Sequence, residues 1–442
     1  MSIKNKAIII LGASGDLAKR KLVPALLKLY AKKELELSCA IIGSGRTDFS
    51  DRQFREHLEV GKEFSGRLFY FQGIKGLRSR VDGLGGFSEI VVFMALPPRV
   101  YAQTARELAE EGFGNETTLI IEKPFGSDYD SAAELNRELH KYFSEKQIFR
   151  IDHYLAKEAV QNILVFRYAN PVFYPIWNSS YIESIQINAL EDIGIVNRGQ
   201  YFDNAGIIRD MAQNHLIQLL ALLTMEAPVS LSAEDIRTQK INLLKTIEFN
   251  EVRKFQYKGY LEEKGVAPGS LTETFAELKL SINNFRWNGV PIYIRTGKAA
   301  RRKGTEIGVR LKKLPRLLFN KDGMIESNTI IFKIQPAEGI ILNLSSKVPG
   351  GKDISIGPSE MSFCLRENFE GEIPEAYQKL LLDALNGDKT LFVSAEETEL
   401  AWKKIAPLLV SGKPELYEKG SVPSGLTEVE WIDFDRYATA CY

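Results

Sequence analysis

A short stretch of the chain concentrates side chains that can move protons or bind anions. Between Phe149 and Glu158, ten residues include two acids, an imidazole, a phenol and an ammonium group. Asp152, His153 and Tyr154 follow an apolar run typical of a strand and precede a helical pattern. They are therefore expected at the carboxyl end of a strand, where open α/β sheets bind ligands. This density predicts a functional site.

Histidine is the usual side chain for proton transfer near neutral pH, and the chain has four. His57 and His140 lie in charged helical segments and are expected to be solvated surface residues. His153 and His215 remain as candidates for a general base. His215 leads into an apolar helical run, where a histidine is more often a hydrogen-bonded core residue than a base. The segment by itself favours that structural role.

A glycine-containing turn near the N-terminus has the context of a dinucleotide-binding motif. Gly12, Gly15 and Ala18 follow an apolar strand pattern and open an amphipathic helical pattern. Glycines let the backbone approach a pyrophosphate, and the N-terminus of the helix offers free N–H groups. The spacing is G-x-x-G-x-x-A and not G-x-G-x-x-G, so a tight turn without a ligand is the alternative.

The end of the second predicted strand indicates which nicotinamide cofactor is bound. NAD-binding proteins place an acid there to hold the ribose 2′-OH, whereas an arginine accommodates the 2′-phosphate of NADP. Here Arg46 occupies this place, and the nearest acid, Asp48, lies two residues further on. The pattern favours NADP. The alternative is that Arg46 is a solvated loop residue.

Length and periodicity predict two domains. The 442 residues exceed the ~250–300 at which a single core usually stops growing. Residues 1–150 alternate short apolar runs with helical patterns, which indicates βαβ units; from about residue 177 longer alternating runs predict antiparallel strands. We predict an α/β Rossmann-like dinucleotide-binding domain over residues 1–151. An α+β domain with a large, mainly antiparallel sheet would cover residues 152–442.

Two segments are harder to place. One is residues 45–88, in which the part from Gly61 to Gly86 is glycine-rich and only weakly periodic and is interpreted as an abbreviated connection. The polar segment past Gly412 is expected to wrap the surface or to be loosely ordered.

Composition excludes several functional classes. With 57 basic and 57 acidic residues the chain has no net field to hold nucleic acid or an anionic membrane. No apolar run reaches the roughly 18 residues of a spanning helix, and the N-terminus lacks a signal-peptide pattern. The three cysteines, Cys39, Cys364 and Cys441, are far apart and odd in number, which argues against a disulfide framework and a structural zinc site. We expect a reduced, cytoplasmic protein.

Four blocks of the sequence, in this order, resemble the glucose-6-phosphate dehydrogenase family. They are IIILGASGDLAKRKLVPAL (8–26), IIEKPFG (120–126), RIDHYLAKE (150–158) and RDMAQNH (209–215). The resemblance implies NADP-dependent oxidation of D-glucose 6-phosphate at C1 to 6-phospho-D-glucono-1,5-lactone, the first step of the oxidative pentose phosphate pathway of glucose metabolism. It also implies a homodimer or a dimer of dimers, with a substrate-binding and dimerising second domain and no metal.

The resemblance assigns the chemistry to a few residues, and for His215 it implies a catalytic role where the local pattern favoured a structural one. His215 would be the general base, and Asp152 would hydrogen-bond its ring. Lys123, in the E-K-P block, would contact both cofactor and sugar near C1. The substrate phosphate would lie among a cation, a phenol and an imidazole, a set that suits a dianion. These phosphate ligands would be His153, Tyr154 and Lys157.

Further binding residues follow from the same resemblance. Glu191 and Asp210 would accept hydrogen bonds from sugar hydroxyls; otherwise each is an ordinary acid at a strand end or a helix start. Lys298 and Lys303 would be substrate-binding cations. The predicted cofactor-binding residues are Gly12, Ala13, Ser14, Gly15, Asp16, Leu17, Ala18, Lys19, Arg46, Tyr101 and Lys123.

The chain also departs from the family. It is short, with the loss expected between residues 50 and 88, and it has Ala337 where an aspartate and Val422 where a tryptophan are expected. A second, structural NADP site of the kind animal members carry stays open. Because glucose–fructose oxidoreductase-like dehydrogenases share E-K-P, another sugar oxidoreductase is one alternative. An inactive NADP-binding sensor is the other, although it would need neither His215 nor Lys123.

Overall fold

The structure is a computed structural model that describes residues 3, 5–36, 38–61, 64, 66–315, 325–350, 354–369, 373–410 and 412–441. It divides the chain into two compact units. Unit 1 comprises Met1–Ala156, Pro228–Thr238 and Pro374–Trp402, and unit 2 comprises Lys157–Ala227, Gln239–Ile373 and Lys403–Tyr442. The first boundary therefore falls inside the RIDHYLAKE block, between Ala156 and Lys157.

Unit 1 is built on a seven-stranded sheet with the order β15-β6-β5-β4-β1-β2-β3. Strands β1 to β6 pair in parallel, and β15 pairs antiparallel with β6. This 3-2-1-4-5-6 order is that of a Rossmann fold and confirms the prediction for the N-terminal part. The strands are β1 (Lys6–Leu11), β2 (Ala40–Gly45), β3 (Leu68–Gln72), β4 (Glu89–Met94), β5 (Thr117–Ile121), β6 (Ile148–Ile151) and β15 (Phe392–Val393).

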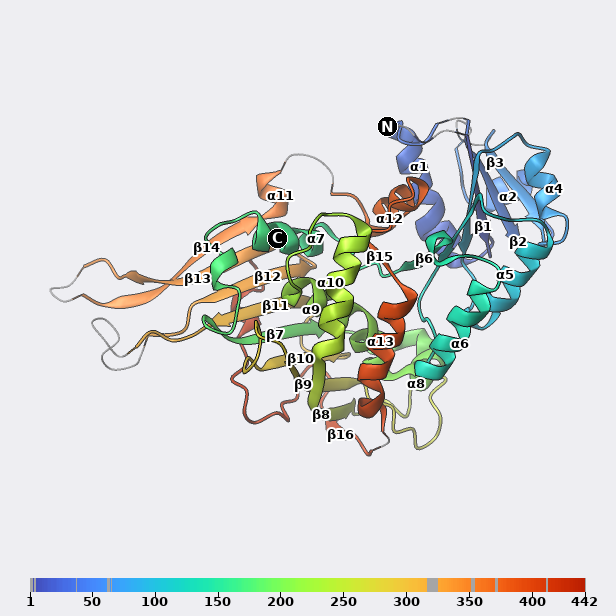
Figure 1. Cartoon of the computed structure of the whole chain (residues 1–442). Helices are drawn as coiled ribbons and strands as arrows, with labels where there is room; N and C mark the ends of the chain where they lie inside the picture. Colours follow the sequence, from blue (N-terminus) through green and yellow to red (C-terminus); the bar gives the residue numbers. More distant parts are fainter. Residues whose placement is uncertain are drawn as a thin grey trace. The chain divides into compact units, whose positions relative to one another are not determined.

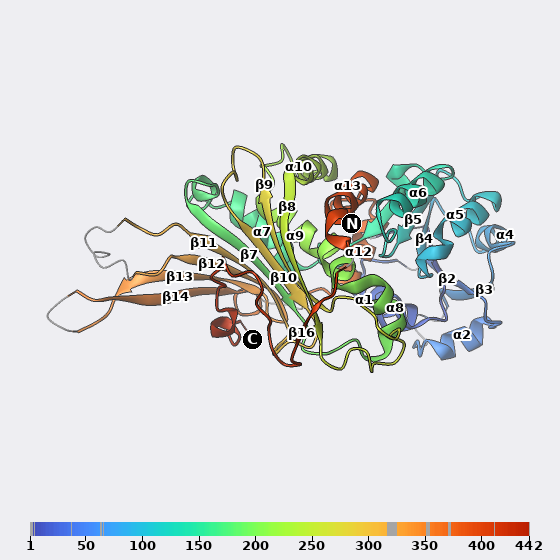
Figure 2. The ribbon, with the colours of Figure 1, turned by 90° about the horizontal axis from the view of Figure 1, so that it is seen from below.

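Helices cover both faces of this sheet. Figure 2 shows α4, α5 and α6 on one side of the strands and α1 on the other. Alternate residues of β1, such as Ile9, pack in one core with Tyr101 and Leu108 of α5. Strand residues buried on both sides are typical of parallel sheets. The helices are α1 (Val23–Ala31), α2 (Asp51–His57), α4 (Leu77–Asp82), α5 (Tyr101–Glu110), α6 (Tyr129–His140) and α12 (Ala376–Leu385).

The segment from Gly61 to Gly86 forms regular elements in its described residues, which corrects its interpretation as an abbreviated connection. It contains the strand β3 and the helix α4, and α2 precedes it. In β3 the side chains of Leu68 and Tyr70 are buried, whereas Phe69 and Phe71 are half-buried. Both sets of side chains are apolar, so the sequence lacks the polar alternation by which an edge strand is usually identified.

Unit 2 is built on a nine-stranded sheet with the order β14-β13-β12-β11-β7-β10-β9-β8-β16. The pairs β7–β10 and β8–β16 are parallel and the other pairs antiparallel, so the predicted mainly antiparallel sheet is confirmed. Figure 1 shows α7 and α9 over one face, with α7 packed on β12. The strands are β7 (Ile182–Leu190), β8 (Ile247–Tyr257), β9 (Phe275–Ile282), β10 (Ile292–Gly297), β11 (Gly304–Leu311), β12 (Thr329–Gln335), β13 (Gly339–Lys347), β14 (Ile356–Cys364) and β16 (Glu415–Tyr417).

The helices of unit 2 include three consecutive segments with a kink at Gly206. These are α8 (Gly199–Ile207), a π-helical segment η6 (Ile208–Leu216) and α9 (Ile217–Thr224). The unit also contains α7 (Glu158–Tyr168) and α11 (Leu365–Asn368). The residues of α10 (Ala233–Thr246) and α13 (Ala395–Ile405) are divided between the two units.

The C-terminal segment packs on the sheet of unit 2, so of the two expected alternatives it wraps the surface and is not loosely ordered. Ile432, Phe434 and Tyr437 are buried against Ile331 and Ile341 of the sheet. Apolar side chains spaced two or three residues apart in this polar segment supply the core contacts. Burial of this kind stabilises by roughly 25 cal/mol per Å² of apolar surface.

The tail is also cross-linked, so the expectation of no disulfide was wrong. Cys364 and Cys441, which are 77 residues apart, form a disulfide with a Cα–Cα distance of 4.9 Å. Spacing along the chain could not reveal the bond, because the return of the tail to the end of β14 brings the two cysteines together. Ala337 packs against this disulfide, so a small apolar residue is accommodated where the family resemblance led us to expect an aspartate.

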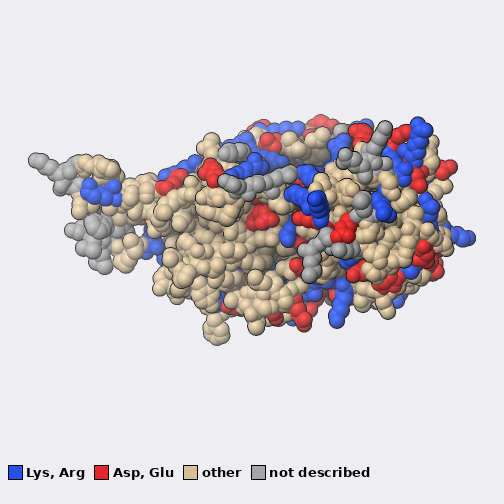
Figure 3. Space-filling model, turned by 90° about the horizontal axis from the view of Figure 1, so that it is seen from above, with Lys and Arg blue, Asp and Glu red and all other residues tan. Residues whose placement is uncertain are grey.

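The surface agrees with the balanced charge of the chain. Lys and Arg side chains lie among Asp and Glu side chains on the face in Figure 3. Within the described ranges, no helix combines the length and the apolar composition needed to span a membrane.

Candidate active site

The glycine turn after β1 lies at the carboxyl ends of three neighbouring strands. Gly12 N and Ala13 N donate hydrogen bonds of 2.7 and 3.0 Å to the carbonyl oxygen of Ser44 in β2. Gly12 has φ +80°, and a Cβ there would collide with the carbonyl oxygen of Ala95, just after β4. Gly12 is therefore required both by its left-handed conformation and by the close approach of β4. The turn lies at the β1/β4 switch point of the sheet, where such folds bind ligands.

A cavity of about 560 Å³ opens at this switch point. Gly12, Ser14, Gly15 and Arg46, all predicted from the sequence, line it. A glycine cradle beside an exposed guanidinium fits a dinucleotide that carries a 2′-phosphate. Residues that the sequence analysis did not identify also line the cavity: Thr47, Gly73, Ile74, Ala95, Leu96, Pro97, Arg99, Val100, Gln103, Thr104 and Glu107.

Several of these additional residues had a visible signal. Residues 95–99 follow β4 directly, and the segments after parallel strands form the ligand-binding edge of such a sheet. The position of Thr47 is set by a tertiary contact instead. Its carbonyl oxygen accepts a 2.7 Å hydrogen bond from the Tyr70 hydroxyl of β3. This contact joins the Arg46 loop to a strand that the periodicity did not predict.

Other predicted cofactor residues lie around the turn and do not line the cavity. Asp16 pairs with Arg20, and Lys19 pairs with Glu59, each at 2.6 Å. The remaining three, Ala13, Leu17 and Ala18, are apolar, and their cofactor contacts stay predictions.

His57 is closer to the cofactor turn than a solvated surface histidine would be. Its Nε2 lies 3.3 Å from the carbonyl oxygen of Ser14, and its ring packs near Phe49. The helix α2 ends at His57, and the path of the chain after β2 places this residue beside the glycine turn. His140, by contrast, lies in the last turn of α6 and pairs with Glu145 at 3.0 Å. It is partly exposed, in agreement with its predicted surface position.

The ends of β5 and β6 place the other chemical groups of unit 1. The two strands pair with Ile121 opposite Arg150, so Lys123 and Asp152 follow adjacent strand ends. Glu122 directly precedes Lys123, and the charges of Lys123 and Asp152 both act on the pKa of its carboxyl. Burial is the larger effect and raises the pKa of Glu122 to about 7.

The residues after Asp152 form a tight turn. Tyr154 N donates a 3.0 Å hydrogen bond to Asp152 Oδ1, and the Tyr154 side chain is buried. The ring of His153 meets the ring of Tyr154 edge-on at a centroid distance of 5.1 Å. The structure thus brings these three predicted residues together at the end of β6.

Tyr101 is also in unit 1, but its hydroxyl is engaged with the backbone. The side chain is fully buried, and the hydroxyl donates to the carbonyl oxygen of Glu122 at 3.0 Å. The amide of Glu122 lies 3.3 Å from the same hydroxyl and donates back to it. The predicted contact of Tyr101 with the cofactor stays a prediction.

His215 lies in the π-helical segment of unit 2. Its side chain is buried, and its amide donates to Asn214 Oδ1 at 2.6 Å. π-Helical turns are rare and occur frequently at functional sites. The segment begins after Gly206, which has φ +71° and packs against the carboxylate of Glu273. That carboxylate accepts a 3.2 Å hydrogen bond from Ile208 N and satisfies a donor at the start of the segment.

Three predicted substrate residues meet at one edge of the unit 2 sheet. Strands β7 and β10 run in parallel with Leu190 opposite Gly297, so Glu191 and Lys298 follow adjacent strand ends. Their side chains form a salt bridge of 2.6 Å. Lys303 immediately precedes β11, whose first residue is opposite the end of β7.

Lys157 lies at the N-terminus of α7, and the charges of Glu338 and Lys303 both act on the pKa of its ammonium group. Burial is the largest effect and lowers the pKa of the Lys157 ammonium, while Glu338 acts in the opposite direction. Burial likewise raises the pKa of Glu338. Glu338, in the turn from β12 to β13, was missed because nothing in its local pattern shows that it lies beside Lys157.

Asp210 accepts a 3.3 Å hydrogen bond from the Tyr201 hydroxyl within the same helical region. Burial, reinforced by the charge of Asp210, raises the pKa of Tyr201 to about 12. Asp152 belongs to unit 1, and His215 to unit 2. Their pairing as a dyad stays a prediction.

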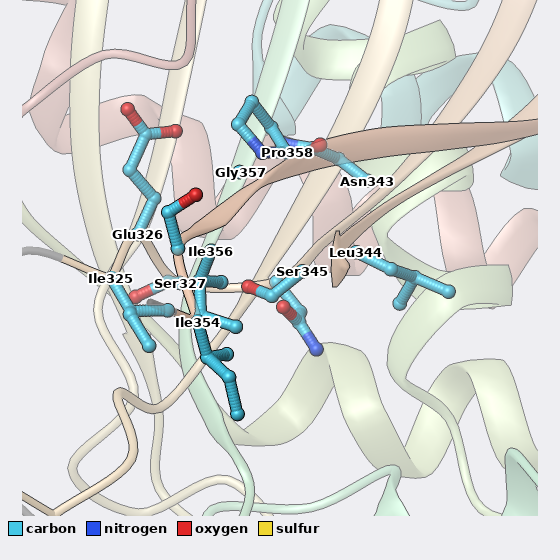
Figure 4. Close-up of a pocket in the computed structure, with 12 residues that line it drawn as sticks. Ile325, Glu326, Ser327, Asn343, Leu344, Ser345, Ile354, Ile356, Gly357 and Pro358 are labelled. Carbon is cyan, nitrogen blue, oxygen red and sulfur yellow. The ribbon is translucent and has the colours of Figure 1, made fainter. Parts of the chain in front are cut away.

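Another cavity, of about 360 Å³, lies beside β12, β13 and β14 (Figure 4). Among the described residues, its lining carries one charged side chain, Glu326, and none of the predicted site residues.

Comparison with known proteins covers both units. The family model for the glucose-6-phosphate dehydrogenase NAD binding domain matches residues 9–162, and that for the C-terminal domain matches residues 164–429. A chloroplastic glucose-6-phosphate 1-dehydrogenase of Spinacia oleracea is 38% identical over 94% of this chain and 80% of its own. The glucose-6-phosphate 1-dehydrogenase of Dictyostelium discoideum is 39% identical over 94% of this chain and 91% of its own.

A solved structure gives the same result. It is described as glucose-6-phosphate dehydrogenase in complex with its substrate glucose-6-phosphate, and it matches 96% of each chain with a TM-score of 0.90 and 35% identity.

Proposed function

The chain belongs to the glucose-6-phosphate dehydrogenase family, and we propose that it oxidises D-glucose 6-phosphate at C1 to 6-phospho-D-glucono-1,5-lactone with NADP. This is the first step of the oxidative pentose phosphate pathway. The observation that carries the proposal is a family match over both units that retains His215, Asp152 and Lys123.

His215 would take the proton of the C1 hydroxyl, which makes departure of the C1 hydride favourable. Asp152 would orient the imidazole and stabilise its protonated form, as the acid does in hydrolytic triads. Lys123 would hydrogen-bond the sugar near C1. NADP, when bound, accepts the hydride. Every proton and electron is then placed, since the hydroxyl proton goes to His215 and the hydride to the cofactor.

The cofactor would lie in the switch-point cavity of unit 1. The glycine turn would hold its pyrophosphate, and Arg46 its 2′-phosphate, in a charge-assisted contact. Support comes from the exposure of Arg46 and from the close approach that Gly12 permits. The other predicted cofactor residues, including Tyr101 and Lys19, would complete this site.

The sugar hydroxyls and the phosphate would be bound by the other charged groups. Glu191 and Asp210 would accept from hydroxyls. Lys157 and Lys303 would bind the phosphate with His153 and Tyr154. The charge of Lys303 acts on the Lys157 ammonium and lowers its pKa, which supports this assignment because two neighbouring cations favour a dianion. Lys298, paired with Glu191, would complete the contacts to the sugar.

The deciding measurement is NADPH production. Purified protein should reduce NADP with glucose 6-phosphate far faster than with glucose, and faster than it reduces NAD under the same conditions. Equal rates with both sugars would instead favour a different sugar oxidoreductase. Cofactor binding without turnover of either sugar would favour an inactive sensor.

Two finer features complete the proposal: a homodimer or dimer of dimers, and a cytoplasmic location. Met361 of the edge strand β14 is 61% exposed, which is compatible with an apolar contact between copies. Light scattering after size-exclusion chromatography would give the oligomeric state. Because some matched relatives are chloroplastic, fractionation of cells that express the native protein is needed for the location.

A further inference from the structure

Two tyrosine hydroxyls from distant parts of the sequence hold the residue that precedes Lys123. Tyr377, in the first turn of α12, donates a 2.8 Å hydrogen bond to Glu122 Oε1. Tyr101, at the start of α5, donates to the Glu122 carbonyl oxygen at 3.0 Å and accepts from the Glu122 amide. Side chain and backbone of one residue are thus both fixed, directly before Lys123.

The helix that carries Tyr377 is itself anchored. α12 packs on α1, and Glu375, the residue before this helix, pairs with Lys28 at 3.2 Å and with Lys21 at 3.5 Å. All of these contacts lie within unit 1. The position of the Tyr377 hydroxyl is therefore set by elements other than the strand end that it contacts.

We propose that Glu122, held by Tyr377 and Tyr101, is a positioning residue for Lys123 in the oxidation of glucose 6-phosphate. The inference rests on the proposed function, because it concerns the residue assigned there to the sugar near C1. A lysine side chain is long and flexible, and binding the residue next to it restricts where its ammonium can lie.

Ionisation of Glu122 would make this positioning depend on pH. The charged groups around its carboxyl are Lys123 and Asp152, with the phenols of Tyr377 and Tyr101 beside them. Burial raises the pKa of Glu122 to about 7. As the pH rises through this value, the carboxyl becomes a negative partner for the Lys123 ammonium. The ionised form is therefore the one that holds the ammonium.

The test compares the pH profiles of kcat for Tyr377→Phe, Glu122→Gln and wild type. Loss of the Tyr377 hydrogen bond disfavours the carboxylate, so Tyr377→Phe should move the rising limb of kcat up by about one pH unit. Glu122→Gln cannot ionise, so its kcat should match that of wild type at about pH 6 and fall several-fold below it at about pH 8. Tyr142→Phe, a partly exposed phenol in unit 1, is the matched control and should follow wild type.

Either of two results would overturn the proposal. One is a pair of profiles parallel to wild type, lowered by the same factor at every pH, as expected of a purely structural role. The other is an unchanged kcat in both variants. Failure of Tyr377→Phe to fold would leave Glu122→Gln to decide.

A second measurement is independent of catalysis. A carboxyl with a raised pKa binds its proton more tightly when folded than when unfolded, so its contribution to stability falls as pH rises from about 4.5 to about 7. The melting temperature of wild type should fall more over this window than that of Glu122→Gln. Equal slopes would count against the raised pKa and so against the pH-dependent positioning. If wild type did not turn over glucose 6-phosphate, the proposed function would fail, and this slope would still report on Glu122.

Discussion

The two units obtain their binding groups in different ways. Unit 1 presents a contiguous turn, Gly12 to Ala18, together with the next strand end at Arg46. Unit 2 assembles its charged groups from a helix start, two strand ends and two turns that span nearly two hundred residues of sequence, at Lys157, Glu191, Lys298, Lys303 and Glu338. A contiguous motif can be identified by its spacing. Charges gathered by a sheet have no local signature.

The two units also differ in how their charged groups are partnered. Arg46 is exposed at the edge of the cofactor cavity. In unit 2, Lys298 is bonded to Glu191, and Lys157 lies beside Glu338. A cation that already has an acidic neighbour is held in place, and it gains less from a ligand phosphate. Substitution of Lys157 or Lys298 in unit 2 should therefore weaken substrate binding less than substitution of Arg46 in unit 1 weakens NADP binding.

The largest expected effect concerns the base. His215→Asn should lower kcat by ~10²–10⁴ with a much smaller change in KM, because the proton leaves only in the transition state. Steady-state kinetics with glucose 6-phosphate and NADP measure both constants. His140→Asn is the control, and it should be close to wild type. A near-normal kcat in His215→Asn would assign the buried His215 to the core alone.

Cofactor choice tests the contiguous site of unit 1. Arg46→Ala should weaken NADP by roughly 2–4 kcal/mol and barely affect NAD, since only NADP carries the 2′-phosphate. Titration calorimetry with each cofactor gives the two affinities. Arg52→Ala, an exposed arginine paired with Glu56, is the control. Equal losses for both cofactors would make Arg46 a structural residue.

Stability tests the cross-linked tail of unit 2. Cys441→Ser should lower the free energy of unfolding by about 2–4 kcal/mol, because the open chain gains entropy when unfolded. Chemical denaturation under oxidising conditions measures the change. A reductant should lower the stability of wild type and leave Cys441→Ser unaffected. No difference between the two proteins would mean that the tail is held by the burial of Ile432, Phe434 and Tyr437 instead.

The smallest expected effect concerns the phosphate cluster. Lys157→Ala should raise KM for glucose 6-phosphate, with a loss of about 1.5–3 kcal/mol in charge-assisted contacts. The poor activity on unphosphorylated glucose should hardly change, because glucose does not use these contacts. Lys264→Ala, an exposed lysine of unit 2, is the control. Equal damage with both sugars would assign Lys157 to the fold and withdraw the phosphate role.

Much of the fold and the candidate site could be predicted because both depend on local patterns. Apolar runs followed by helical patterns predicted a parallel, Rossmann-like sheet, and alternation predicted the large antiparallel sheet. The spacing around Gly12 and Arg46 predicted residues that line the switch-point cavity, and their contacts with the cofactor stay predictions. The roles of His215 and Lys123 required the family resemblance, since a buried helical histidine by itself favours the core. Those roles stay predictions.

What the patterns could not reveal depends on parts of the chain that meet only after folding. Residues 374–402 join unit 1, where β15 extends the sheet and α12 brings Tyr377 to Glu122. The Cys364–Cys441 bond and the charge interaction of Glu338 with Lys157 likewise join residues that are far apart in the sequence. The sequence by itself determined the family, the cofactor turn and the periodicity of each element, because these follow from neighbouring residues. Only the tertiary structure decided which distant acids, phenols and thiols become neighbours, and hence which pKa values shift, because burial and charge act through space and not along the chain.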